Sequence, residues 1–167
     1  MTDKFVSILM GSDSDLPVVE PALKILEEFQ IAYEVKMTSA HRTPLVTTKY
    51  VKDAEERGCS VFICAAGMAA HLAGAVAAAT LKPVIGIPIN ASLNGLDALL
   101  STAQMPAGIP VATVAIGKAG AKNAAYLATQ ILAISESNLL QRLVEERKKN
   151  ADTVVSKDKA LQEKLNL

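Results

Sequence analysis

One stretch near the N-terminus decides the fold: FVSILMGSDSD, residues 5–15. Residues 5–10 form a short apolar run, which is typical of a strand in the centre of a sheet. Residues 11–15 add a glycine, hydroxyls and carboxylates, a composition typical of a loop that leads into a helix. From Leu16 to Phe29, apolar residues then recur at helical spacing with charged residues between them. The stretch therefore predicts a strand that passes through a polar loop into a helix.

The same unit recurs along the chain. Further strands are predicted at residues 31–37, 60–65, 83–88 and 111–116, and further helices at residues 45–57, 69–80, 96–103 and 121–134. This alternation predicts a parallel sheet covered by helices on both faces. We therefore expect an α/β fold, a three-layer α/β/α sandwich with a five-stranded parallel sheet. Because the sequence contains no internal repeat or linker, we expect one domain over residues 1–167, with a core at about 5–135.

The last segment, residues 137–167, differs from this core. Its apolar residues recur among many charged ones, which predicts a C-terminal helical extension of one amphipathic helix or two. Because the sheet is complete before this segment begins, its apolar stripe needs another surface. We hypothesise docking on a neighbouring subunit, and packing back on the same chain is the alternative.

Charge excludes some classes of function. The 17 Lys and Arg residues balance 17 Asp and Glu residues, so the formal net charge is zero. A general binder of nucleic acid or of anionic membranes needs a basic excess, so neither is expected as a partner. Zero net charge also gives little protection against self-association, which fits a chain that assembles.

One uncharged segment, residues 59–81, is long enough to span a membrane. It is rich in alanine, contains His71, and lacks flanking aromatic belts, so a buried strand followed by a buried helix explains it better. The first residues also lack the basic-then-apolar pattern of a signal peptide. We therefore expect a soluble, cytoplasmic protein.

The two cysteines, Cys59 and Cys64, lie five residues apart on one predicted strand. Residues i and i+5 of a regular strand point to opposite faces, so neither a disulfide nor a shared metal is expected. Both are interpreted as buried thiols of a reducing compartment.

Ligands bind at the carboxyl ends of the strands in an open α/β sheet, and polar or glycine-rich loops follow four of the predicted strands. They are residues 11–15, 39–44, 66–71 and 90–95. The second, SAHRTP, contains His41, whose imidazole is the side chain best suited to proton transfer, and Arg42, which can fork onto a phosphate or carboxylate. Thr43 and Pro44 are typical of a helix start, with a hydroxyl cap before a proline. These residues predict either a functional site or a capped loop with a solvated arginine.

The loops at 11–15 and 66–71 leave similar alternatives. The Ser12 loop suits a sugar phosphate, with hydroxyls and N–H groups for the phosphate and a carboxylate for ribose hydroxyls, or it is an ordinary helix cap. His71 stands in an apolar segment, where a histidine is more often a hydrogen-bonded core residue, although small neighbours leave room for a flat ring or a small gas molecule. The sequence lacks the motifs of a dinucleotide turn, a Walker loop, a zinc site and a nucleophile elbow.

Taken together, the motifs resemble those of the N5-carboxyaminoimidazole ribonucleotide mutases of purine biosynthesis, class I of the AIR carboxylase catalytic-subunit family. They occur in the family's order and cover residues 5 to about 135: GSDSD at 11–15, SAHRTP at 39–44, AAHL at 69–72, PVIGIP at 83–88 and QMPAGIPV at 104–111. Two positions differ from the pattern: Met68, where a glycine is common, and Ala73, where a proline is common.

The resemblance implies a flavodoxin-like fold, a homo-octamer with active sites between subunits, and an isomerase of purine (IMP) biosynthesis. The implied reaction moves a carboxylate from the exocyclic nitrogen of the ribonucleotide to ring carbon C4, through transient CO2 and without a metal or cofactor. Ser12, Asp15 and Arg42 match the family's substrate-binding positions, and His41 matches its proton carrier. The candidate site is therefore His41 as the catalytic residue, with Ser12, Ser14, Asp15, Ser39, Ala40, Arg42, Gly67, Ala69 and His71 as substrate-binding residues.

The implied chemistry accounts for these residue types. Protonation of the carbamate nitrogen releases CO2, carbon C4 then attacks it, and a base removes the C4 proton. One histidine near its own pKa can give the first proton and take the second. Arg42 and the Ser12 loop would anchor the phosphate, Asp15 would hold the ribose, and the alanine-rich walls near His71 would retain CO2 and exclude water.

Two alternatives stay open. The nearer one is the related carboxylase, which uses free CO2 with the unmodified ribonucleotide, although Arg42 after His41 and the pair Ala70-His71 resemble the mutase branch more closely. The other is a non-catalytic flavodoxin-like nucleotide-binding module. An assay of both substrates separates the two enzymes, and binding without turnover would indicate the module.

Overall fold

A computed structural model describes residues 4–165. Its five strands are β1 (Phe5–Met10), β2 (Tyr33–Met37), β3 (Cys59–Gly67), β4 (Val84–Ile89) and β5 (Ala112–Thr113). They form one parallel sheet in the order β2-β1-β3-β4-β5, the order of flavodoxin-like doubly wound sheets. Every residue of β1 and β4 is buried, as expected of continuous apolar runs that have a layer on each face.

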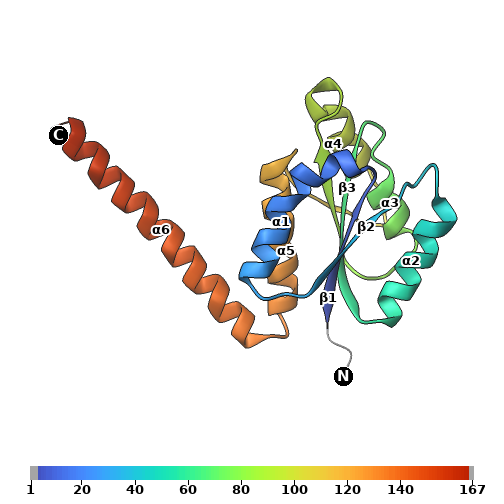
Figure 1. Cartoon of the computed structure of the whole chain (residues 1–167), viewed down its shortest axis with the longest axis horizontal. Helices are drawn as coiled ribbons and strands as arrows, with labels where there is room; N and C mark the ends of the chain where they lie inside the picture. Colours follow the sequence, from blue (N-terminus) through green and yellow to red (C-terminus); the bar gives the residue numbers. More distant parts are fainter. Residues whose placement is uncertain (1–3, 166–167) are drawn as a thin grey trace. The chain divides into compact units, whose positions relative to one another are not determined.

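Helices cover both faces of this sheet (Figure 1). The helices in chain order are α1 (Leu16–Glu28), α2 (Pro44–Glu56), α3 (Leu72–Ala77), α4 (Leu96–Ala103), α5 (Lys118–Ala133) and α6 (Ser137–Leu165), with 3-10 turns η1 (Asp13–Asp15) and η2 (Leu93–Gly95). Helices α1 and α5 lie on one face, where Phe29 and Tyr126 pack edge to face with ring centroids 5.9 Å apart. Helices α2 and α3 pack on the other face around Phe62 and Val76. The predicted three-layer sandwich is confirmed.

The strand at the β5 edge is shorter than the predicted residues 111–116. Only Ala112 and Thr113 pair with β4, opposite Ile85 and Gly86. The chain stays alongside, since the Gly117 N–H donates to the Pro88 carbonyl at 2.9 Å. Pro88 has no N–H to donate toward β5, so the pairing of β4 with β5 does not extend beyond Gly86.

The prediction that Cys59 and Cys64 face opposite sides of the sheet is wrong. Both belong to the buried cluster between the sheet and helices α2 and α3. Phe5 pairs with Cys59 whereas Val6 pairs with Val61, so Ser60 is an extra residue that reverses the alternation. The thiols are free and buried, and burial raises the pKa of both, that of Cys59 to about 11.

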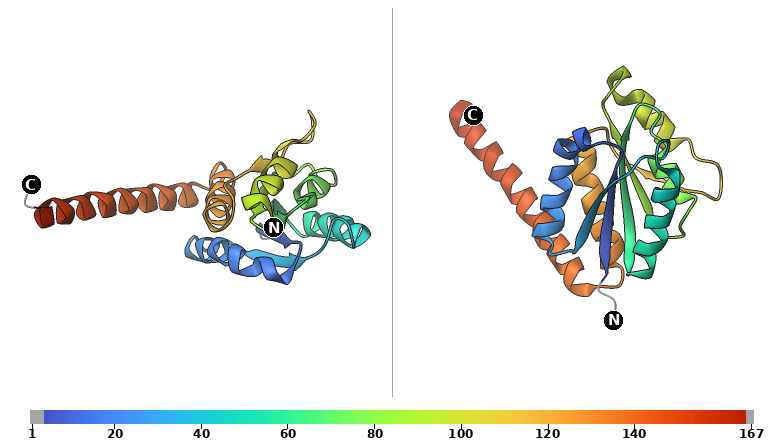
Figure 2. Two further views of the ribbon diagram at one scale, coloured as in Figure 1. Left: turned by 90° about the horizontal axis from the view of Figure 1, so that it is seen from above. Right: turned by 45° about the vertical axis from the view of Figure 1, so that its right-hand side comes forward.

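The chain divides into two compact units, one ending at Thr129 and the other beginning at Gln130. The second contains α6, which is one continuous helix rather than two (Figure 2). Several of its apolar residues are exposed, among them Val144, Val154 and Leu161. The predicted segment also includes residues 166–167, which lie outside the described residues. Its docking on a neighbouring subunit, and the single domain over 1–167, stay predictions.

None of the helices described between residues 4 and 165 is long and apolar enough to cross a membrane.

Candidate functional site

The loops that follow β1, β2 and β3 meet at one cavity of about 490 Å³, with Ala91 after β4 completing its wall. The cavity therefore lies at the carboxyl ends of the strands, where the sequence placed it. All ten candidate residues line it, together with five that were not selected: Gly11, Ala66, Met68, Leu72 and Ala91. Gly11, Ala66, Met68 and Leu72 adjoin the selected residues in the same loops, whereas Ala91 is brought in by β4.

The loop after β1 is held by a capping box. The Ser12 hydroxyl accepts from the Ser14 N–H at 3.3 Å, and the Asp15 carboxylate accepts from the Ser12 N–H at 3.1 Å. The Ser14 hydroxyl also donates to the Ser12 hydroxyl at 2.9 Å, so two hydroxyls stand side by side at the cavity. Burial raises the pKa of Asp15, and the nearby Asp13 adds to this, while the N–H groups of Ser12 and Gly11 oppose it.

The loop after β2 is closed by Thr43, although not as predicted. Thr43 precedes the helix and Pro44 is its first residue, but the Thr43 hydroxyl caps no helical N–H, so the predicted hydroxyl cap is wrong. Instead the hydroxyl accepts from the Ser39 N–H at 2.9 Å and donates to the Ser39 carbonyl at 3.1 Å. The Arg42 N–H donates to the Ser39 hydroxyl at 3.1 Å. These bonds close a tight loop that leaves His41 and Arg42 exposed at the cavity.

Arg42 differs from Arg57 in its ion pairs. The Arg57 guanidinium binds Glu34 and, at 2.8 Å, Asp53. Arg42 forms no ion pair with any residue between 4 and 165. An exposed guanidinium that lines a cavity without an internal partner suits an anionic ligand.

The loop after β3 turns sharply, so α3 begins at Leu72 rather than at the predicted Ala69. The Ala70 N–H donates to the Met68 carbonyl at 2.9 Å, and the His71 N–H donates to the Ala69 carbonyl at 2.8 Å. Met68 has a φ of +56°, a conformation that favours glycine. Gly67 before it is required for space, since a Cβ there would lie 2.9 Å from the Ala91 Cβ.

Two histidines from different loops meet in the cavity. Nε2 of His41 lies 2.7 Å from Nδ1 of His71, within hydrogen-bond distance. Their rings are nearly perpendicular, at 83°, with centroids 4.9 Å apart. His71 is exposed, so the alternative that it is a core histidine is wrong. Between residues 4 and 165, no group of three or more His, Cys, Asp or Glu side chains could hold a metal ion.

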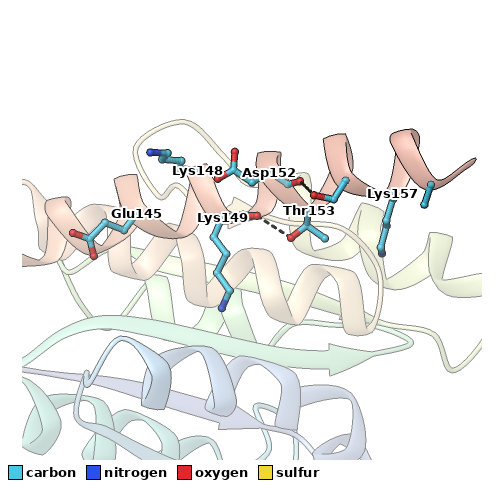
Figure 3. Close-up of a pocket in the computed structure, with 8 residues that line it drawn as sticks. Glu145, Lys148, Lys149, Asp152, Thr153 and Lys157 are labelled. Carbon is cyan, nitrogen blue, oxygen red and sulfur yellow. Dashed lines mark hydrogen bonds between the residues drawn. The ribbon is translucent and has the colours of Figure 1, made fainter. Parts of the chain in front are cut away.

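A second hollow, of about 610 Å³, runs along α6 and is drawn in Figure 3. All its lining residues belong to this one helix, among them Lys149, Thr153 and Lys157. The Thr153 hydroxyl is satisfied within the helix, donating to the Lys149 carbonyl at 2.8 Å. One helix presents a convex surface that encloses no ligand, so we assign no chemistry to this hollow.

Comparison with known proteins gives a consistent result. The family model described as AIR carboxylase matches residues 5–153. An N5-carboxyaminoimidazole ribonucleotide mutase of Pyrococcus abyssi is 58% identical over 139 residues, which cover 83% of this chain and 79% of that protein. The protein of that name from Bacillus subtilis is 50% identical over 151 residues, covering 90% and 93%. Among solved structures, that of Treponema denticola PurE superposes with a TM-score of 0.86 at 30% sequence identity, covering 95% of this chain and 99% of the other.

Proposed function

This chain belongs to the AIR carboxylase family, and we propose that it converts N5-carboxyaminoimidazole ribonucleotide into 4-carboxy-5-aminoimidazole ribonucleotide in de novo purine biosynthesis. It is then an isomerase, as the names of its relatives indicate. The observation that carries the proposal is the pair of imidazoles in contact, inside a cavity that also holds the two hydroxyls of the Ser12 loop and the Arg42 guanidinium, which has no ion pair within residues 4–165. These groups correspond to the proton, phosphate and ribose chemistry that the substrate requires.

In this proposal the nucleotide is held by two loops. The hydroxyls of Ser12 and Ser14 bind the phosphate, and the Arg42 guanidinium forks onto the same group. The Asp15 carboxylate accepts hydrogen bonds from the ribose hydroxyls. The cavity volume of about 490 Å³ lies within the ordinary range for small-molecule sites.

His41 carries the proton. It gives a proton to the carbamate nitrogen, the N–C bond breaks, and CO2 and a neutral exocyclic amine form. Carbon C4 of the electron-rich ring then attacks CO2, and the proton displaced from C4 returns to His41. The proton balance closes over one turnover, so the histidine ends as it began and the proposal requires no metal or cofactor.

The remaining residues surround the ring and the CO2. Ala40, Gly67 and Ala69 line the same cavity as the histidine pair and carry a methyl group or no side chain. Side chains of this kind offer water no hydrogen bond, and close confinement keeps CO2 within reach of C4. Ser39 holds the loop that presents His41, through its bond to the Arg42 N–H.

We also propose that the protein works in the cytoplasm as a homo-oligomer, an octamer with sites between subunits. Large apolar side chains are exposed on the elements that carry the cavity loops, including Leu45, which is 84% exposed, Leu93 and Leu96. Exposed apolar area of this kind favours association with further copies. Mass in solution tests this, and deletion of residues 150–167 tests the role of α6. An unchanged oligomer after deletion would rule out docking by the deleted part.

A substrate-specific assay tests the function itself. The mutase predicts turnover of the N5-carboxy ribonucleotide without added bicarbonate. The related carboxylase, which the name of the family model favours as a second candidate, predicts turnover of aminoimidazole ribonucleotide that rises with bicarbonate. Tight binding of either nucleotide without turnover would contradict both.

A further inference from the structure

The contact between His41 and His71 engages one nitrogen of each ring in a hydrogen bond. Nε2 of His41 and Nδ1 of His71 are 2.7 Å apart, and a bond between two ring nitrogens holds one hydrogen, so one nitrogen donates and the other accepts. We propose that His71 is a positioning residue whose Nδ1 accepts from Nε2 of His41, so that His41 carries the reaction's proton on Nδ1. This inference rests on the proposed function.

The assignment follows from the hydrogens that each state carries. When His41 holds the proton to be transferred, both of its nitrogens bear hydrogen, so Nε2 must donate and Nδ1 of His71 must accept. His71 is then neutral, with its hydrogen on Nε2. Once Nδ1 of His41 has given its proton to the carbamate nitrogen, Nε2 of His41 still bears hydrogen. The same bond to His71 therefore persists, and the return of the C4 proton to Nδ1 restores the first state.

With the opposite assignment the bond between His41 and His71 does not persist through the reaction. If Nε2 of His41 carried the proton, the bond to His71 would have to break before each transfer and form again after it. With Nδ1 as the reacting atom, the ring keeps its orientation throughout the reaction. An orientation that needs no rearrangement is what efficient proton transfer requires.

The backbone supports a positioning role, because both rings stand on fixed loops. His71 directly precedes α3, its N–H donates to the Ala69 carbonyl at 2.8 Å, and its carbonyl accepts from the Ala75 N–H at 2.9 Å. His41 stands on the loop that Thr43 closes onto Ser39. The two rings thus come from separate strand ends, and each limits the rotation of the other.

Three substitutions of His71 test the role of this one nitrogen. The amide oxygen of asparagine lies near the position of imidazole Nδ1, that of glutamine lies near Nε2, and phenylalanine keeps a ring without nitrogen. We expect His71→Phe and His71→Gln to lower kcat about 100-fold, the usual result of a misplaced reacting group, with KM changed less than about threefold. We expect His71→Asn to recover most of the lost kcat. Thermal unfolding and mass in solution verify that each variant folds and assembles.

The outcomes separate this inference from the proposed function. If the wild-type chain does not turn over the N5-carboxy ribonucleotide, the proposed function fails. If it does, but His71→Asn is no better than His71→Phe, or all three variants match the wild type, the positioning role is refuted. Loss of turnover in all three variants to the level of His41→Asn would also refute it, because His71 would then act on the substrate directly.

Nitrogen NMR reports which ring nitrogen of His41 carries hydrogen, and a purely structural role of His71 would not change that tautomer. The chain contains two histidines, so ¹⁵N-histidine labelling gives signals from four ring nitrogens. In His71→Phe only the two signals of His41 remain, which assigns them. At a pH where both rings are neutral, we expect His41 to carry its hydrogen on Nε2 in the wild type and to exchange between both tautomers in His71→Phe. Hydrogen on Nδ1 of His41 in the wild type would overturn the assignment.

Discussion

Met68 and Ala69 give a matched pair of glycine substitutions with opposite expected signs. Met68 lies at the rim of the cavity, is 62% exposed and has a φ of +56°. An L-residue in the left-handed region costs about 1–2 kcal/mol, which glycine avoids. Glycine also loses about 0.4–1 kcal/mol through the greater freedom of its unfolded chain. We therefore expect Met68→Gly to be about 0.5–1 kcal/mol more stable than Met68→Ala. Alanine also removes the thioether chain, but it keeps the Cβ that disfavours a positive φ.

The neighbouring Ala69 provides the control, because it is also exposed but is not among the residues with positive φ. There the relief is absent, and Ala69→Gly is expected to lower the free energy of unfolding by about 0.4–1 kcal/mol. Denaturant midpoints of the variants, measured at one protein concentration because the chain is expected to assemble, give the comparison. If Met68→Ala proved as stable as Met68→Gly, the strain assigned to this turn would be refuted.

Three further predictions concern the site and its support. His41→Asn should lower kcat at least about 100-fold while calorimetry finds nucleotide affinity nearly unchanged, and near-normal turnover would refute the proton-carrier role. Arg42→Lys should weaken substrate affinity about tenfold with little loss of kcat, because lysine cannot form the two parallel hydrogen bonds of a guanidinium. The control Arg57→Lys, outside the cavity, should leave substrate affinity unchanged. A lower kcat at normal affinity in Arg42→Lys would count against the binding role of Arg42. Gly86→Ala should destabilise the fold by about 1–3 kcal/mol in denaturant titrations, since its Cβ would lie 2.3 Å from Cγ2 of Thr102, and a midpoint equal to that of the wild type would contradict this packing.

Much of the fold could be predicted because strands and helices follow from local periodicity. The strand from Phe5 to Met10 and the helix from Leu96 to Ala103 have the predicted bounds. Two differences in the sheet arise where pairing between strands, rather than local pattern, decides. The missing N–H of Pro88 ends β5 early, and the extra residue Ser60 puts both cysteines on one face.

The composition of the cavity could also be predicted, because the carboxyl ends of parallel strands meet at one edge. Its internal geometry could not. The contact of His41 with His71 depends on how two loops from different strands are turned, and the φ of Met68 depends on a turn that no local motif announces. Thr43 shows the same limit, because a hydroxyl before a helix can cap the helix or bond back to its own loop, and here it bonds back to Ser39.

The central claim is that the carboxylate moves within one bound nucleotide, and isotope retention tests it most directly. The wild-type enzyme is given N5-carboxyaminoimidazole ribonucleotide with ¹³C in its carboxylate, in buffer that contains excess unlabelled bicarbonate, and the product is analysed by mass spectrometry after partial turnover. Retention of the label at C4 in most product molecules is predicted, because CO2 stays in the cavity beside His41. Product whose carboxylate has the isotopic composition of the bicarbonate would contradict the account.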